Sequence, residues 1–364
     1  MDQTQTALEE PDGKRNNTSI PHTTYVRPGS AAPYYPGLFQ TTLNKEQQML
    51  FTNNGHGKLV KSLTIEVVSD MDRAWQLWDT FSPKKSLFDT WDFRMAFWQG
   101  YKYDPYFLVL RTGDKPVAVL PLWYEPDRGG YYWFGSWWQE DNTFFVKDPI
   151  LTSLLLAAAP QPLHLNAIKL EAVVDTPLLV TECTADDPKY ILDLNTHPGT
   201  DAFLTSLTHK KRYNFKRDQR IITEQDPQIF YDRFEDFEHL VTLSKERFSQ
   251  KGEDTDWNDL RRVEAFREVI ARGQKKTSFS VRMISVEIDG YLAAVDLIAI
   301  YNGVYYPLKC GYDVHRFPGI GNYMNLLEID DAVDLDAHTI DFLEIGYGWK
   351  DKWFTALPLL KFEK

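Results

Sequence analysis

The chain of 364 residues has few cysteines, no long apolar run and no excess of positive charge. Its two cysteines, Cys183 and Cys310, lie far apart, so neither a disulfide framework nor a zinc site is indicated, and a cytoplasmic location is expected. The most apolar stretch, residues 151–160, is much shorter than the ~20 residues that cross a bilayer. Residues 1–20 lack the apolar core of a secretory signal. We therefore expect no membrane span.

The net charge of −12 indicates that neither DNA nor an anionic membrane surface is the main partner. The eight histidines show no spacing typical of metal ligands, so no metal is expected. Hydrophobic residues make up 43% and charged residues 25% of the chain, which are the proportions of a globular protein. The length is sufficient for two hydrophobic cores.

The most informative segment is residues 316–321, Arg-Phe-Pro-Gly-Ile-Gly. It follows a strand-like aromatic run at 304–310 and precedes an amphipathic helical pattern at 322–333. A glycine turn between a strand and a helix leaves unpaired N–H groups at the helix N-terminus, and Gly319 and Gly321 would let an anion approach the main chain. The segment therefore predicts a phosphate or pyrophosphate site. The alternative is an ordinary glycine-containing turn before a helix.

Arg316, Gly319 and Gly321 match Arg-x-x-Gly-x-Gly, the motif with which GNAT N-acyltransferases bind the pyrophosphate of acyl-CoA, and the chain resembles that superfamily. Its surroundings are similar to the CelD-type and FemABX-like branch, whose members carry two GNAT-like halves. A Tyr-Asp pair at 312–313 precedes the turn, as in that branch. The resemblance covers roughly residues 60–364 and is strongest in the second half.

The end of the chain supports the same resemblance. An Asp-Phe pair at 341–342 leads to Lys350 beside an aromatic residue, as in the branch's Asp-Phe…Gly…Tyr-Lys ending. Two positions depart from that pattern: Trp349 replaces the usual tyrosine, and Gly346 lies one position later.

The resemblance implies an α+β fold of two tandem GNAT-like halves, each a mixed, mostly antiparallel sheet flanked by helices. We expect a flexible N-terminal arm over 1–58, an N-terminal half over 59–195, and a C-terminal half with the acyl-CoA site over 196–364. Hairpins with turns at Gly113-Asp114 and Asp289-Gly290 are the best evidence of an internal repeat. Helices are expected at 71–80, 90–101, 200–222, 234–250 and 260–272, and late strands of the first half at 167–173 and 190–194.

The resemblance places acyl-CoA, as a co-substrate, at the glycine turn. The residues expected to bind it are Cys310, Gly311, Arg316, Gly319, Ile320, Gly321 and Asn322. It also implies a splayed gap between the strands that begin at Val304 and Thr339, where exposed amides would meet the thioester carbonyl.

Asp296 is the first candidate for a general base because it lies in an otherwise apolar run, residues 291–300. A carboxylate there would be desolvated, which would raise its pKa toward the useful range. The alternative is that its side chain turns toward water or caps a neighbouring turn. Glu344, at the end of the next strand, is the second candidate and could equally be a surface residue.

Lys350 matches the position where FemABX-like enzymes carry a lysine near the reacting carbonyl, so the resemblance gives it a role in stabilising the developing oxyanion. A solvated loop of mixed charge over 350–352 is the alternative. Tyr347 is a candidate to return a proton to the leaving thiolate.

Trp137, Trp138 and Asp141 lie in a segment that resembles the branch's loop over the substrate cleft, so they are candidates for acceptor binding, with core packing as the alternative. The basic segment 209–220 contains Arg212 and Lys216 one helical turn apart, where they could meet an anionic substrate. A solvated helix face is the alternative. A tRNA acceptor stem is disfavoured by the net charge but not excluded.

Together these patterns predict an acyl-CoA-dependent N-acyltransferase that moves an acyl group, acetyl in the simplest case, to an amine. The acceptor would be a small molecule, a sugar or a cell-envelope precursor, attacking the thioester directly. One alternative is a FemABX-like aminoacyltransferase that uses aminoacyl-tRNA. Another is a catalytically silent double-GNAT protein that only binds a partner.

Overall fold

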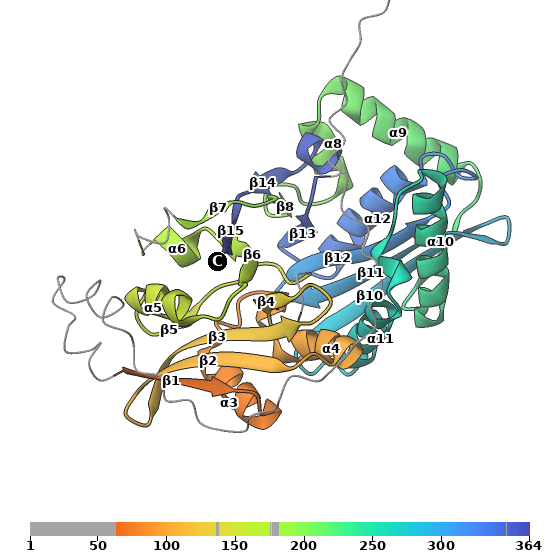
Figure 1. Cartoon of the computed structure of the whole chain (residues 1–364). Coiled ribbons are helices and arrows are strands. Elements are labelled where there is room, and N and C mark those ends of the chain that lie inside the picture. The colour runs from red at the N-terminus through yellow and green to blue at the C-terminus, as the bar shows by residue number, and fades with distance from the viewer. Residues whose placement is uncertain (1–62, 136–137, 175, 177–181, 347) are drawn as a thin grey trace, which may run out of the picture. The chain divides into compact units, whose positions relative to one another are not determined.

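The computed structural model describes residues 63–135, 138–174, 176, 182–346 and 348–364 (Figure 1). All of these belong to one unit of the chain, Leu38–Lys364. The arm expected over 1–58 lies outside the described residues, as do Trp137 and Tyr347.

The first sheet is antiparallel and lies in the N-terminal half. Its strands are β1 (Leu63–Val68), β2 (Pro105–Thr112), β3 (Lys115–Glu125), β4 (Gly130–Trp133) and β5 (Phe145–Val146), with β5 paired to β3. Its helices are α3 (Met71–Phe81), the 3-10 turn η1 (Leu87–Asp89), α4 (Trp91–Tyr101) and α5 (Ile150–Ala158). Successive residues of a strand face opposite sides, so Leu108 and Leu120 pack with α5 whereas Phe107 and Val119 pack with α3.

The large sheet has seven strands in the order β14-β8-β13-β12-β11-β10-β9. Their bounds are β8 (Lys189–Asp193), β9 (Gln228–Tyr231), β10 (Ser280–Ile288), β11 (Tyr291–Tyr301), β12 (Val304–Tyr312), β13 (Thr339–Glu344) and β14 (Thr355–Leu357). The β10–β11 hairpin turns at Asp289 and Gly290, both with positive φ, as a two-residue turn of this type requires. This hairpin and the one at Gly113-Asp114 confirm the predicted pair.

Helices cover both faces of the large sheet (Figure 1). They are α8 (Thr200–Ser206), α9 (His209–Thr223), η2 (Phe234–Asp236), α10 (Phe237–Gln250), η3 (Asp256–Asn258), α11 (Leu260–Gln274), α12 (Ile320–Asp334) and η4 (Lys350–Lys352). On one face Ile298 and Tyr305 pack with α12 and α9; on the other Leu297 and Tyr306 pack with α10 and α11. The α+β class, with mostly antiparallel sheets flanked by helices, is confirmed.

The two halves exchange strands. β8 precedes the boundary predicted at 195 yet pairs with β13 and β14 in the large sheet. Conversely β15 (Leu359–Glu363), at the C-terminal end, pairs with β6 (His164–Lys169) and β7 (Thr184–Ala185) in a third sheet. A single cut at 195 therefore does not separate the two cores.

Helices α4 and α11 join the halves directly. A Cβ atom on Gly100 would lie 2.5 Å from the carbonyl oxygen of Arg261, so only glycine allows the two helices to approach this closely. Phe93 and Phe97 of α4 share one buried cluster with Phe266 of α11. This packing fixes the N-terminal half against the sheet that carries the glycine turn.

Two predicted elements were wrong in detail. The helix expected over 200–222 is divided into α8 and α9, because Leu207 and Thr208 have extended backbone between them. The strand expected over 167–173 ends at Lys169, and α6 (Glu171–Val174) follows it. In the part of the chain that the structure describes, no helix has the length and apolar character needed to span a membrane.

Candidate active site

The parallel pairing of β12 with β13 stops after two residue pairs, Val304 with Thr339 and Tyr305 with Ile340. β13 then continues as the partner of β8, and its register with β8 shifts between Asp341 and Glu344. Within these two fully described strands, β12 has no β13 partner beyond Tyr305. The strands therefore diverge, as the resemblance implied, and the described part of β12 beyond Tyr305 has no strand partner on that side.

The end of β13 is irregular and is held by Lys350. Leu343 and Ile345 both have a φ of 64°, a left-handed conformation that is uncommon for such side chains. The ammonium of Lys350 donates to the carbonyls of Phe342 at 2.5 Å and Glu344 at 2.8 Å, with a longer contact to that of Leu343 at 3.5 Å. Burial lowers the pKa of Lys350 to about 8, against the opposing effect of Glu140 and Asp341. The loop of solvated charge considered for 350–352 is wrong for this residue.

A buried ion triplet joins the two halves next to this strand. The ammonium of Lys189 donates to both oxygens of Asp141 at 2.8 Å and to Asp341 at 2.6 Å. Burial alone would lower the pKa of Lys189, but Asp341 and Asp141 raise it well above its ordinary value. Asp141, a candidate for acceptor binding, therefore lies beside β13 and is committed to this triplet.

Glu140 and Glu344 form a second contact between the halves. The backbone N–H of Glu344 donates to Oε1 of Glu140 at 2.9 Å. Burial, with Glu344 and Asp341, raises the pKa of Glu140 well above its ordinary value. Burial, with Asp186, Asp187 and Asp141, raises the pKa of Glu344 to about 8. Glu140 was missed by the sequence analysis, although it directly precedes the predicted Asp141.

The loop that presents Glu140 and Asp141 is anchored by the buried Arg94 of α4. Its guanidinium donates to the carbonyls of Phe88 at 2.7 Å and Phe134 at 2.9 Å, and to the Asn142 side chain at 2.7 Å. Asn142 in turn donates to the carbonyl of Gln139 at 2.7 Å. A guanidinium has donors in a fixed planar arrangement, so it can hold both ends of the loop in one geometry.

Asp296 is fully buried on β11, at 0% exposure, rather than turned toward water. Tyr312 donates its hydroxyl to Oδ2 of Asp296 at 2.9 Å, and the carboxyl of Glu328 on α12 is hydrogen-bonded to Asp296 as well. Two carboxyl groups can share a hydrogen bond only when one carries a proton. Burial raises the pKa of Asp296 to about 7 and that of Glu328 well above its ordinary value. Lys350 is close enough to lower the pKa of Glu328, which places this pair near the gap.

The glycine turn enters α12 through Gly319, whose φ is 96°. Two of the turn's amides are satisfied internally: Phe317 donates to the carbonyl of Asp313 at 3.0 Å and Ile320 to that of Phe317 at 3.1 Å. Within the described part of the chain, the amides of Gly319, Gly321 and Asn322 have no protein acceptor. The first turn of α12 therefore presents free N–H groups, the feature that the sequence predicted there.

A carboxylate already lies beside this turn. Asp218 of α9 is buried and accepts a hydrogen bond from the Asn322 side chain at 2.6 Å. A Cβ atom on Gly319 would lie 2.9 Å from Cβ of Asp218 and 3.0 Å from its carboxyl carbon. Arg217 donates to the other carboxylate oxygen at 2.7 Å and 2.8 Å. The positive end of α12 thus faces the carboxylate of Asp218, a contact that no local pattern in the sequence indicated.

The other residues predicted to bind the cofactor differ in how exposed they are and in what they contact. Arg316 is half-exposed, and its guanidinium lies 4.0 Å from the ring centre of Tyr291. Cys310 pairs with Asp296 across the strands, and burial raises the pKa of its thiol to about 11. Gly311 is covered by α10, because a Cβ atom there would lie 2.4 Å from the Leu240 carbonyl oxygen. The packing of α10 against β12 therefore explains why residue 311 is a glycine.

The remaining predicted substrate residues lie away from the gap or within the fold. Trp138 stacks on Phe97 at 5.6 Å between ring centres and packs edge-on to Phe266 at 5.2 Å, which is the core packing considered as the alternative. Arg212 donates to the carbonyls of Leu204, Thr205 and Leu207 and so caps α8. Lys216 is exposed on α9. Among the described residues, no group of His, Cys, Asp and Glu side chains could hold a metal ion.

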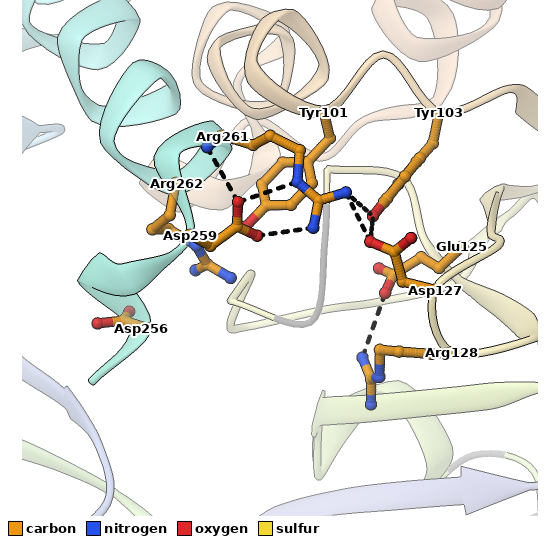
Figure 2. Close-up of a pocket in the computed structure, with 9 residues that line it drawn as sticks. All are labelled: Tyr101, Tyr103, Glu125, Asp127, Arg128, Asp256, Asp259, Arg261 and Arg262. Atoms are coloured by element: carbon orange, nitrogen blue, oxygen red, sulfur yellow. Dashed lines mark hydrogen bonds and ion pairs between the residues drawn. The ribbon is translucent and has the colours of Figure 1, made fainter. Parts of the chain in front are cut away.

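A cavity of about 260 Å³ lies where α4, the β3–β4 turn and the start of α11 meet (Figure 2). It is lined by Tyr101, Tyr103, Glu125, Asp127, Arg128, Asp256, Asp259, Arg261 and Arg262. Figure 2 shows Arg261 reaching across it, with bonds to Tyr103 at 3.0 Å and Asp127 at 2.5 Å. None of the predicted site residues lines this cavity, and its charged groups are largely paired with one another.

Residues 209–351, which carry the glycine turn, the diverging strands and Lys350, match the family model of the acetyltransferase (GNAT) domain. This segment is a GNAT domain. At the level of the family, the match supports N-acyl transfer by this segment. No curated protein matches the chain in sequence.

Solved structures extend the likeness to both halves. The structure of FemX is 10% identical, covers 82% of this chain and 97% of its own, and has a TM-score of 0.54. A conserved protein of unknown function from Bacteroides thetaiotaomicron VPI-5482 is 13% identical over 82% and 98%, with a TM-score of 0.53. A tandem GNAT protein from the clavulanic acid biosynthesis pathway is 13% identical over 83% and 98%, with a TM-score of 0.50. The fold outside the GNAT domain is therefore the first half of a tandem-GNAT arrangement, as predicted.

Proposed function

We propose that the chain is an N-acyltransferase whose reacting centre lies in the gap between β12 and β13, with acyl-CoA as the donor. This proposal rests on the point where the pairing of β12 with β13 ends, after Tyr305 and Ile340. A buried group of acidic residues and lysines from both halves lies beside that point. The free edge of β12 would bind the donor's carbonyl and its arm through main-chain groups. The acceptor amine would attack that carbonyl directly.

The residues around the gap suggest separate roles. Lys350 is a positioning residue, because its ammonium holds the carbonyls at the end of β13 and brings positive potential to the gap. Asp296 is held by Tyr312 and Glu328 in the core beneath α12, so it suits a proton store better than direct contact with an amine. Glu344 is only partly buried and lies at the end of the diverging strand, which makes it the better base.

The donor proposal is tested by thermal unfolding with acetyl-CoA, a longer acyl-CoA and free CoA. A ligand that binds only the folded chain raises Tm by mass action. We expect Arg316→Ala and Gly321→Glu to remove the shift, since the first deletes the charge and the second adds an anion among the free amides. Arg220→Ala, an exposed arginine of α9, is the matched control. A shift that survives both changes would place the donor elsewhere.

Asp218 favours a second candidate donor, one that needs no diphosphate at the glycine turn. Its carboxylate and a diphosphate would repel each other at the same helix end. An aminoacyl-tRNA, which the FemABX resemblance implies, would carry its phosphates elsewhere. If Asp218→Asn gains a CoA shift that the native chain lacks, and the native chain binds charged tRNA, the second candidate replaces the first. If neither donor binds the folded chain, the catalytically silent alternative is favoured.

A further inference from the structure

At the contact between Glu140 and Glu344, two buried carboxyl oxygens lack a hydrogen-bond partner. They are Oε2 of Glu140 and Oε1 of Glu344, and no donor among the described residues reaches either of them. Glu140 is 5% exposed and lies in the anchored loop of the N-terminal half, whereas Glu344 ends β13. A buried acceptor without a partner costs about 1–3 kcal/mol, so a fold that retains two of them side by side has a feature that packing alone does not explain.

The charges around this pair are unbalanced. Four further carboxylates surround it: Asp141, Asp186, Asp187 and Asp341. Two lysines oppose them, but Lys189 is bound to Asp141 and Asp341, and Lys350 is bound to the carbonyls that end β13. Both lysines are close enough to interact electrostatically with the pair, but in the described part of the chain neither donates a hydrogen bond to the free oxygens of Glu140 and Glu344.

The acidic residues around the pair differ in exposure. Glu344 is partly buried, Asp186 is half-buried and Asp187 is exposed, so the acidic group extends from the buried oxygens to the surface. Carboxylates arranged in this way attract a positively charged group and raise its local concentration. A primary ammonium fits the site because it carries one positive charge and three N–H donors, enough for both free oxygens.

We infer that Glu140 and Glu344 bind the protonated amine of the acceptor, and that Glu344 takes its proton before transfer. In that step one N–H bond of the ammonium breaks and an O–H bond forms on the Glu344 carboxylate. The electron pair left on nitrogen then forms a bond to the carbonyl carbon of the donor's thioester or ester. The carbon–sulfur or carbon–oxygen bond of the donor breaks, and the second proton lost by the nitrogen is taken up by the leaving thiolate or alkoxide. The identity of the amine as acceptor rests on the proposed N-acyl transfer, whereas the binding of an ammonium does not.

Binding is tested without any donor. Thermal unfolding is followed with n-butylammonium chloride, and with n-butanol and sodium chloride at the same concentrations. We expect only n-butylammonium to raise Tm, by about 2–4 °C at a concentration several times its Kd. The shift should grow from pH 6 to pH 9, since burial raises the pKa of Glu344 to about 8 and the ammonium needs ionised carboxylates.

The matched variants are Glu140→Gln, Glu344→Gln and, as a control, Glu171→Gln, which is exposed on α6. We expect the first two to lose the shift without losing stability, because an amide keeps the shape and removes a buried charge, and the control to keep it. Equal responses of all three variants, or an equal effect of n-butanol, would overturn the inference. If n-butylammonium binds as expected but no acyl donor binds, the ammonium site at Glu140 and Glu344 is supported and the proposed N-acyl transfer is overturned.

Once a donor is known, a second readout separates a base from a structural residue. Glu344→Gln should lower kcat/KM by about 10²–10⁴-fold and remove the rise of the rate with pH, since general-base catalysis contributes on that order. A uniform loss at all pH values, with the pH profile unchanged, would contradict the role of a base.

Discussion

Gly319 lies directly against Asp218, and the contact leaves no room for a side chain. Its φ is 96°, and an added Cβ atom would be 2.9 Å from Cβ of Asp218. We expect Gly319→Ala to lower the free energy of unfolding by about 1–3 kcal/mol, because the left-handed conformation and the contact both oppose it. Urea denaturation measures this change.

Gly321 is the matched control for that substitution. A Cβ atom there would lie 3.6 Å from the Tyr312 ring, an ordinary contact, and its φ is not positive. Gly321→Ala should therefore be neutral or stabilise α12 by up to about 1 kcal/mol through helix propensity. Similar losses at both glycines would show that the turn as a whole, rather than the Asp218 contact, is sensitive.

Local patterns were sufficient for much of this fold and not for the rest. The hairpin at Asp289-Gly290, the glycine turn and the buried Asp296 are all encoded within a few neighbouring residues, and the structure contains each of them. The division of the predicted helix over 200–222 depends on Arg212 capping α8, which helical periodicity does not report.

The candidate site was the harder part because its contacts are distant in sequence. Lys189 contacts Asp341, and Glu140 contacts Glu344, only after β8 has joined the large sheet and Arg94 has bound Asn142 beside Glu140. Nothing near Lys189 in the chain distinguishes it from a surface lysine. The acidic pair at 140–141, two residues after the tryptophan pair at 137–138, was the one signal that could have drawn attention to Glu140.

Removing Lys189 should be costly. Lys189→Met would leave Asp141 and Asp341 buried without their cation, which typically costs about 3–5 kcal/mol. Arg267→Met, which breaks an exposed pair with Glu238, should cost about 0–1 kcal/mol. Chemical denaturation of both variants tests the comparison, and equal small losses would mean that water reaches the Lys189 triplet.

Asp296 should make stability depend on pH. Its pKa is raised by burial to about 7, so its contribution is fully present below pH 4 and is lost as the pH rises through about 7. Asp296→Asn cannot ionise and should flatten the decrease in the free energy of unfolding between pH 4 and pH 7. Parallel curves for the native chain and the variant would show that Asp296 titrates normally.

The end of β13 should lose its irregular shape when Lys350 is removed. Lys350→Met leaves the carbonyls of Phe342 and Glu344 without their donor, at a cost of about 1–3 kcal/mol. Hydrogen exchange at the amides of Leu343 and Glu344 should become faster, because both amides depend on the geometry that Lys350 maintains. Lys352→Met, an exposed neighbour, should leave stability and exchange unchanged. If Lys350→Met behaves like this control, the lysine does not hold β13 and its burial must be explained by a direct contact with the substrate.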